Sequence, residues 1–506
     1  MSKQTTRRRL LASVGGLAGL ALGGTAGAVP ARAAASSADE LPLRWNRQYG
    51  SNTYNSAVSM LERDDQYVVL GTTGPEPTQT SGWLYGVDAT TGAGQWQTTV
   101  ENTDLDRQPQ FQTLVDAPDG DGFALLGARL TEGVASLVRT GPEGSASWWE
   151  EYGVETDGDA SGTFLSASLV PAEDGYFVCG SQLAGTSISA VVVSAGLDGS
   201  ERSRTVLFQD ERSNLLDAVP DGEGGLIAAG QLQERTTGTD RPQARAVVVR
   251  LNPDLSVAWE REFTAPGDGD PFQTNLLRAV TETADGYAAV GTAAPEGGSS
   301  AQGWVLLLDA EANERASRLF DPQPVTSLTD VVEASDGLTV VGQLAESSTS
   351  TAVTGWVAEL GPDGEGRWSK TLGPAATNNL VDGVATSDEG VALVGTVQAE
   401  SSDADPRTQG WLVKLGGEPA PSVTSTPSDS TATPEPTATR TPEPTATPTP
   451  EPTVTPTPTA TPAEMATETP DDGTTSGSGP GFGVVGTVTA LGAGALYRHL
   501  TADDEA

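Results

Sequence analysis

The sequence contains almost none of the residues on which imidazole and thiol chemistry depends. Its one histidine, His499, stands near the C-terminal end, and its one cysteine is Cys179. Residues 36–417 therefore offer no Ser–His or Cys–His pair and no histidine ligand for a metal. A single cysteine also excludes an intramolecular disulfide. Because Cys179 lies in the apolar run YFVCG, we expect it to be a small buried strand residue.

Basic residues are scarce as well. The chain has 28 Lys+Arg against 68 Asp+Glu, a formal net charge of −40, and its only lysines are Lys3, Lys370 and Lys414. So negative a protein repels phosphates, and we expect no nucleic-acid partner. Acidic, lysine-poor chains resemble the proteins of extreme halophiles. At about 1 M salt the Debye length falls to about 3 Å, which screens the self-repulsion of such a surface.

Hydrophobic residues make up 36% of the chain and aromatic residues only 5%, so the core must consist mainly of Val, Leu and Ala. They occur in a repeated unit, of which Ser335 to Gly373 is a typical copy. Each copy contains a short strand-like run that ends in a glycine, and a spacing of 50 to 61 residues indicates a repeat fold. The seven marker glycines are Gly71, Gly127, Gly180, Gly230, Gly291, Gly342 and Gly395.

The sequence predicts four strands in each copy except the last, which lacks the fourth. Six copies have a closing strand, which contains Trp96, Trp148, Arg204, Trp259, Arg318 or Trp368. The seventh copy ends at Gly417 without one, and the run from Leu43 to Gly50 supplies the missing strand. The pattern predicts an all-β fold, a seven-bladed β-propeller of four-stranded antiparallel blades over residues 36–417, with the N-terminal strand closing the last blade.

One turn carries a family resemblance. Val87 to Trp96, VDATTGAGQW, resembles the D-x-x-T-G-x-x-x-W repeat of pyrroloquinoline-quinone-type propellers, in which the tryptophan docks one blade on the next. Other copies keep partial forms, as around Trp259 and Trp368. The resemblance implies the fold over most of residues 43–417. It does not imply the quinone cofactor, since those enzymes have eight blades and no ligand set of theirs can be carried over.

The N-terminal residues 1–35 are typical of a secretory signal. Basic residues precede a Gly/Ala/Leu run to Val29, and Ala31-Arg32-Ala33 provides a small-x-small cleavage site. Arg7 and Arg8 before Leu10-Leu11 resemble a twin-arginine export signal, which carries folded cargo. The alternative, a retained membrane anchor, would require a longer and more apolar run.

The C-terminal part predicts a surface anchor. Residues 418–479 are a Thr/Pro-rich repeat without apolar periodicity, which predicts a disordered stalk. In residues 480–506, Pro480, Gly481 and Phe482 precede an apolar run that we expect to be helical, and then Arg498. This order resembles the PGF-CTERM sorting signal of archaeal surface proteins, which implies cleavage by an archaeosortase-like enzyme and attachment of a lipid. A plain transmembrane helix is the alternative. Both place the protein extracellularly, at the cell surface.

Candidate binding residues come from the innermost strands, which should line a central channel. Aligning NLLDAV, NLLRAV, SLTDVV and NLVDGV brings Asp217, Arg278, Asp330 and Asp382 to one position, where Ser56, Thr113 and Ala167 stand in the other blades. Three carboxylates would suit Ca²⁺, and a solvated Arg–Asp network is the alternative. The turns Asp157-Gly158-Asp159 and Asp268-Gly269-Asp270 are further calcium candidates, although neither has EF-hand spacing. We expect no other cofactor.

Long, variable links should emerge on one face of the propeller, where recognition loops are commonly held. Between second and third strands they include Thr72 to Ser81 and Gln231 to Gln243. No GxSxG, P-loop or dinucleotide motif occurs, so no catalytic residues are predicted. We predict a binding or interaction module on a haloarchaeal envelope, with export machinery, glycans or envelope proteins as partners. The alternative is an extracellular hydrolase or quinoprotein-like oxidoreductase that uses carboxylates on the long-loop face.

Overall fold

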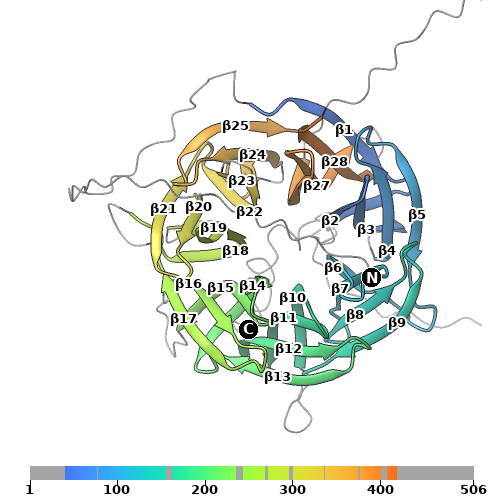
Figure 1. The fold of residues 1–506 in the computed structure, drawn as a ribbon, viewed down its shortest axis with the longest axis horizontal. Helices are drawn as coiled ribbons and strands as arrows, with labels where there is room; N and C mark the ends of the chain where they lie inside the picture. The colour runs from blue at the N-terminus through green and yellow to red at the C-terminus, as the bar shows by residue number, and fades with distance from the viewer. Residues whose placement is uncertain are drawn as a thin grey trace, which may run out of the picture. The chain divides into compact units, whose positions relative to one another are not determined.

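The computed structural model describes residues 40–418, apart from 77, 155–161, 235–242, 268–271, 296–299, 335–336, 351, 374–376 and 400–406. Several predictions therefore lie outside the described residues. They are the signal segment with Arg7 and Arg8, the stalk, the sorting segment with Pro480, Gly481 and Phe482, and both Asp-Gly-Asp turns. The 28 strands form seven four-stranded antiparallel sheets, arranged as blades around a common axis (Figure 1).

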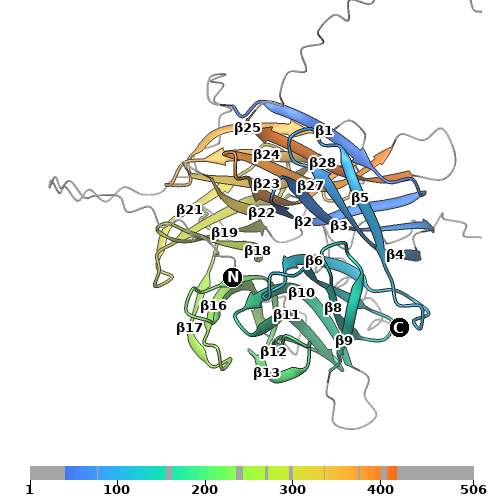
Figure 2. The ribbon, with the colours of Figure 1, turned by 45° about the vertical axis from the view of Figure 1, so that its right-hand side comes forward.

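The strands follow one another radially within each blade, from the axis to the rim (Figures 1 and 2). Blade 1 is β2 (Tyr54–Arg63), β3 (Gln66–Glu76), β4 (Gln79–Asp88) and β5 (Gly94–Val100). Blade 2 is β6 (Gln110–Asp116), β7 (Phe123–Arg129), β8 (Val134–Thr140) and β9 (Ala146–Tyr152). Blade 3 is β10 (Gly162–Ala172), β11 (Gly175–Ala184), β12 (Ser187–Gly196) and β13 (Glu201–Leu207). Blade 4 is β14 (Glu211–Pro220), β15 (Leu226–Glu234), β16 (Ala244–Leu251) and β17 (Val257–Phe263).

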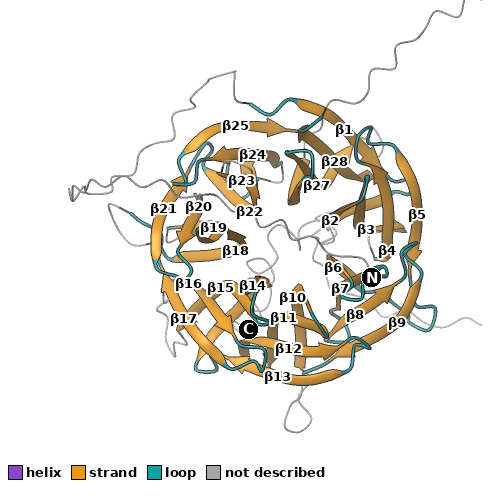
Figure 3. Ribbon diagram, viewed as in Figure 1, coloured by secondary structure: helices purple, strands orange, loops and turns teal. Residues whose placement is uncertain are grey.

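Blades 5 to 7 continue the same order. Blade 5 is β18 (Thr274–Thr283), β19 (Gly286–Ala294), β20 (Gln302–Leu308) and β21 (Glu314–Phe320). Blade 6 is β22 (Val325–Ala334), β23 (Gly337–Ala345), β24 (Thr354–Leu360) and β25 (Gly366–Leu372). Blade 7 is β26 (Thr377–Ala385), β27 (Gly390–Ala399), β28 (Arg407–Gly416) and β1 (Leu43–Tyr49). All other described residues are loops and turns (Figure 3), and none belongs to a helix that could cross a membrane.

The N-terminal strand closes the ring, as the sequence predicts. β1 pairs antiparallel with β28, with Trp45 opposite Lys414. Trp45 is buried against Tyr67 of blade 1, and its indole N–H donates to the Ala89 carbonyl at 3.2 Å. The Tyr49 hydroxyl donates to the Gly92 carbonyl at 2.6 Å. One strand therefore completes the sheet of blade 7 and holds the outer turn of blade 1.

The core is divided among the interfaces between neighbouring blades. Between blades 1 and 2, Leu70 and Leu84 pack with Phe111 and Phe123, and Trp96 covers the edge of this cluster. Each such interface buries aliphatic side chains from both sheets, and burial contributes about 25 cal/mol per Å² of apolar surface. The few tryptophans thus lie where one blade meets the next. Cys179 is fully buried in β11, so that prediction is confirmed.

The marker glycines are explained by a β-bulge in every innermost strand. In each blade the innermost strand shifts register opposite the glycine, as between Leu215 and Asp217 opposite Gly230. A Cβ atom on Gly230 would lie 1.9 Å from the Asn214 carbonyl oxygen, a distance that no side chain tolerates. Close approach of the bulged backbone therefore requires glycine at this position.

Candidate functional site

The bulges determine which side chains reach the ring axis. We call the extra residue of each bulge the bulge residue and the next one the post-bulge residue. The bulge residues are Val58, Gln112, Ala167, Leu216, Arg278, Thr329 and Val381. The post-bulge residues are Ser59, Thr113, Ser168, Asp217, Ala279, Asp330 and Asp382.

This register corrects the sequence alignment at three positions. Asp217, Asp330, Asp382 and Thr113 are indeed equivalent. Arg278, however, is a bulge residue and Ala279 is the equivalent of Asp217, because Leu277 rather than Leu276 pairs with the marker glycine. The positions assigned to Ala167 and Ser56 belong to Ser168 and Ser59.

The three equivalent carboxylates hold neighbouring blades together. Asp217 Oδ2 accepts from the Val280 N–H at 2.9 Å, which links blades 4 and 5. Asp330 Oδ2 accepts from the Gly383 N–H at 2.8 Å, which links blades 6 and 7. Asp382 Oδ2 accepts from the Met60 N–H at 3.0 Å, which links blade 7 to blade 1. In each case the donor is the residue after the post-bulge position of the next blade.

Serine hydroxyls accept equivalent hydrogen bonds from the next blade in two other blades. Ser59 Oγ accepts from the Leu114 N–H at 3.4 Å, and Ser168 Oγ accepts from the Ala218 N–H at 3.2 Å. Ser168 Oγ also lies 2.9 Å from Asp217 Oδ1 and donates to it. The Thr113 hydroxyl instead donates to the Ala167 carbonyl at 3.1 Å. Only the alanine of blade 5, among the post-bulge residues, has no polar side chain to offer.

The carboxyl groups are partly exposed at the axis but surrounded by protein, and this environment favours their neutral forms. Burial raises the pKa of Asp217 to about 7, although the Val280 N–H partly offsets the effect. Burial raises the pKa of Asp382 to about 6. Burial and the adjacent Asp382 carboxylate raise the pKa of Asp330 well above its ordinary value. The closeness of the two carboxyl groups therefore favours the protonated form of Asp330.

The alternatives predicted for these residues can be compared with this geometry. Within the described residues, no group of three carboxylate or thiolate side chains is close enough to hold a metal ion. Among the described residues, Arg278 forms no direct ion pair with a carboxylate. The hydrogen bonds of Asp217, Asp330 and Asp382 instead run from one blade to the next.

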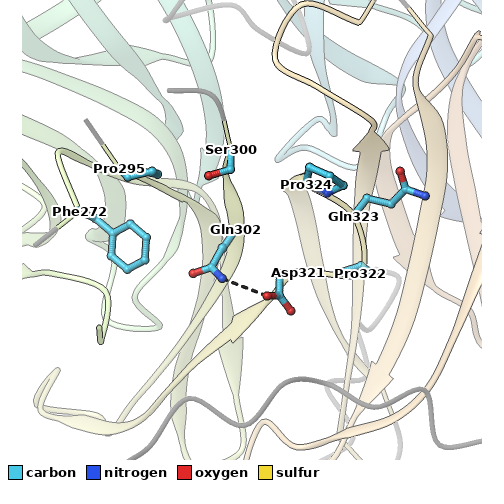
Figure 4. Close-up of a pocket in the computed structure, with 8 residues that line it drawn as sticks. All are labelled: Phe272, Pro295, Ser300, Gln302, Asp321, Pro322, Gln323 and Pro324. Carbon is cyan, nitrogen blue, oxygen red and sulfur yellow. Dashed lines mark hydrogen bonds between the residues drawn. The ribbon is translucent and has the colours of Figure 1, made fainter. Parts of the chain in front are cut away.

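A second candidate site is a groove on the long-loop face of blade 5, with a volume of about 530 Å³. Its residues come from the link between β19 and β20, from the start of β20 and from the links that precede β18 and β22 (Figure 4). We call this the loop-face groove, and it is lined by Phe272, Pro295, Ser300, Gln302, Asp321, Pro322, Gln323 and Pro324. In blade 5, therefore, the two classes of long link do meet on one face.

The walls of the groove are fixed by hydrogen bonds. Gln302 Nε2 donates to Asp321 Oδ2 at 3.2 Å across its floor (Figure 4). The Ala301 N–H donates to the Pro324 carbonyl at 3.0 Å, and the Thr326 N–H donates to the Ala301 carbonyl at 2.9 Å. Phe272 stands on the opposite side, where its carbonyl accepts from Gln243 Nε2 at 2.7 Å.

Sequence reasoning located the long-loop face but not the residues of this groove. Phe272 and the Asp321-Pro322-Gln323-Pro324 link belong to blade-to-blade connections that share no motif with the other copies. A Pro-rich link next to an amide at the start of a strand is the only sequence signal, and it is weak. The serines at positions 59 and 168 were missed because the bulges shift the register.

The comparisons with known proteins give similarity of fold only. No protein-family model matches the chain, and no curated protein matches its sequence. Similar solved structures include the β-propeller domain of the Trilobed protease from Pyrococcus furiosus, at 9% identity and a TM-score of 0.40, covering 71% of this chain and 93% of that one. They also include an acylaminoacyl peptidase of Pyrococcus horikoshii, at 8% identity and a TM-score of 0.39. The alignment covers 72% of this chain and 52% of the peptidase, so this chain spans about half the peptidase's length.

A third similar structure is the WD40 domain of SCAP from fission yeast, at 11% identity and a TM-score of 0.32, covering 72% of this chain and 94% of that one. Identities and TM-scores this low carry no argument about activity or partners.

Proposed function

We propose that this protein is an exported, C-terminally anchored propeller that acts as a binding module on a haloarchaeal cell surface. The export and anchoring parts rest on the sequence at both ends, with Arg7 and Arg8 in the first and Pro480, Gly481 and Phe482 in the second. The haloarchaeal part rests on the net charge of −40 with three lysines. The PGF-CTERM resemblance adds an archaeosortase-like enzyme and a membrane lipid as partners in anchoring.

The observation that favours binding over catalysis is the composition of the loop-face groove. It combines an aromatic ring, three prolines, a hydroxyl and two carboxamides with a single carboxylate, Asp321. A general acid–base mechanism would require a second titratable group within hydrogen-bond reach of the same substrate. The carboxyl groups at the ring axis accept hydrogen bonds from the backbone of the next blade, which gives them a structural role.

The chemistry of the groove favours a neutral, hydroxyl-rich ligand such as a glycan. Phe272 offers an apolar face for the C–H surface of a sugar ring, while Gln302, Gln323 and Asp321 offer amide donors and oxygen acceptors for hydroxyls. No cation lines the groove among the described residues, and the surrounding protein is strongly acidic. An anionic polymer would therefore be repelled.

Binding of the mature protein to a panel of neutral glycans and envelope polymers in high salt tests this proposal. Phe272→Ala and Gln302→Ala should each weaken binding at least tenfold, because they remove the stacking surface and the central amide. Gln209→Ala is the matched control, since Gln209 is an exposed amide in the link between blades 3 and 4. Full binding by both groove variants, or no binding by the wild-type protein, would refute the assignment.

One observation favours the enzymatic alternative. Burial raises the pKa of both Asp330 and the neighbouring Asp382, and pairs of carboxyl groups with raised pKa values serve as general acid and base in hydrolases. A hydrolase that used them would lose activity toward glycosides or esters in the Asp382→Asn variant but not in Asp321→Asn. No activity in the wild-type protein, or equal activity in the two variants, would exclude this enzymatic role, and the pair would then only link blades.

Mass spectrometry of the mature protein tests the anchoring. A lipid-modified C-terminus without residues 483–497 is the expected result. An intact peptide that covers Gly483 to Tyr497 would exclude C-terminal processing.

A further inference from the structure

Arg278 is placed differently from the other charged residues near the ring axis. It is the bulge residue of β18, between Leu277 and Ala279. Leu277 packs into the core between blades 4 and 5, and Ala279 packs into the core between blades 5 and 6. The bulge thus directs its two neighbours into different cores, and Arg278 remains partly exposed at the axis.

The guanidinium group of Arg278 has no partner among the described residues. Its Nε atom is buried and forms no hydrogen bond, and none of the ion pairs of the described chain includes it. Burial lowers the pKa of Arg278 to about 10, with no neighbouring carboxylate to oppose the effect. The group nevertheless remains charged at neutral pH.

The nearest carboxyl groups along the ring are already engaged. Asp217 Oδ1 and Oδ2 accept from the Ser168 hydroxyl and the Val280 N–H. Asp330 Oδ2 accepts from the Gly383 N–H, and burial together with the nearby Asp382 carboxylate raises the pKa of Asp330. In a chain with a net charge of −40, this cation therefore has no counter-charge among the residues that the structure describes.

A guanidinium whose Nε is buried without an acceptor is costly, because this part of the group loses its hydration and gains no attraction in return. A carboxylate or another oxyanion matches the planar fork of arginine with two parallel hydrogen bonds, which restores that loss. We propose that Arg278 binds a small carboxylate or other oxyanion at the axis of the ring. The site is separate from the loop-face groove and does not depend on the function proposed for it.

The charge at the axis also restricts the anion. Among the described bulge and post-bulge residues, Arg278 is the only cation. A singly charged anion such as acetate, or the carboxylate at one end of a longer chain, matches this charge. A multiply charged phosphate would lack a second cation among these residues.

Thermal unfolding of the mature full-length protein with rising sodium acetate tests the site. Screening of the net charge acts on wild type and Arg278→Gln alike, so the difference between them reports binding at Arg278. At ten times the dissociation constant, binding should shift the wild-type folding equilibrium about elevenfold further than that of Arg278→Gln. Arg261→Gln on β17 removes an exposed arginine and should respond as wild type does. Equal responses of wild type and Arg278→Gln would overturn the proposal.

A second titration identifies the source of the anion. A uronic-acid oligosaccharide carries the carboxylate on a polymer, whereas acetate represents a free ion. Saturable heat with acetate alone indicates an ion site, and saturable heat with both indicates that a chain end can enter. If Arg278→Gln does not fold, this calorimetric titration of the wild-type protein decides. No saturable heat with either probe would overturn the proposal.

Discussion

The Gly383 N–H donates to Asp330 Oδ2 across the boundary between blades 6 and 7, at 2.8 Å. The same N–H also donates to Oδ1 of Asp382, the preceding residue, at 2.8 Å. One backbone donor thus joins two carboxyl groups from two blades. It gives the acidic residues on the innermost strands of blades 6 and 7 a structural role.

Removing this acceptor should loosen the ring. Asp330→Ala removes the cross-blade acceptor and leaves the Gly383 N–H only Asp382 Oδ1, so we expect the free energy of unfolding to fall by about 1–2 kcal/mol. Asp330→Asn keeps an acceptor oxygen and should remain within about 1 kcal/mol of wild type. Urea denaturation measures both. Equal effects of the two variants would show that the cross-blade bond contributes little, and Asp285→Asn, in an exposed turn, is the control for charge.

The free energy of unfolding should decrease as pH rises from about 4 to about 7. The folded protein holds protons on Asp217, Asp330 and Asp382 above pH 3.8, the ordinary pKa of the aspartate side chain, so between about pH 4 and pH 7 it binds more protons than the unfolded chain. The stabilisation is present in full below pH 4 and is lost as pH rises through the folded values, about 7 for Asp217 and about 6 for Asp382.

Asp217→Asn isolates one of these groups. The variant cannot ionise, so its free energy of unfolding should depend less on pH between about 4 and 7, by an amount on the order of a few kcal/mol. Chemical denaturation at a series of pH values measures this slope. A variant with the wild-type slope would show that Asp217 titrates normally.

The marker glycines should not tolerate a side chain. Gly230→Ala would place a Cβ atom 1.9 Å from the Asn214 carbonyl oxygen, so the bulge or the strand must move. We expect a loss of at least about 3 kcal/mol or failure to fold. Gly94→Ala is the matched control, because nothing lies within 4 Å of its Cβ position. Comparable thermal midpoints for the two variants would disprove the close-approach explanation.

Ring closure should depend on Trp45. The side chain is 5% exposed, and Trp45→Ala removes its packing on Tyr67 and its bond to Ala89. We expect a loss of about 3–5 kcal/mol in guanidinium denaturation. Trp259→Ala, on the outer strand of blade 4, removes a half-buried tryptophan and should cost less. A smaller loss for Trp45→Ala than for Trp259→Ala would mean that β1 is dispensable for closure.

High salt should stabilise the protein. A net charge of −40 repels itself, and screening grows as the Debye length shortens from about 8 Å at physiological salt to about 3 Å at 1 M. The thermal midpoint should rise steadily with potassium chloride over this range. Sucrose is the uncharged control and acts by exclusion rather than screening. A thermal midpoint that does not change with potassium chloride would argue against the halophilic interpretation.

The sequence predicted the blades well because two signals agreed. Each marker glycine fixes a close approach, and the absent strand after Gly417 has a counterpart at Leu43 to Gly50. Side-chain position at the axis was harder to predict. Turns between the first two strands differ in length, so Asp217 precedes its glycine by 13 residues and Asp330 by 12. A bulge then shifts the register again, and Arg278 takes a position that counting residues cannot reveal.

The loop-face groove could not have been predicted in this way. It brings Phe272, Gln302 and Asp321 together from three separate links, and each link differs from its counterparts in the other blades. Only the three-dimensional structure shows that the three links meet.

The pairing of β1 with β28 also determines how the ring would bear a mechanical load. Any pull on the chain beyond Glu418 reaches the propeller through β28, which is hydrogen-bonded on one side to β27 and on the other to β1. Force along the strand must break both ladders in shear, with their bonds loaded together rather than one after another. A tether at this point therefore pulls on a strand that is paired on both sides. An edge strand, paired on one side only, would separate from its sheet at a lower force.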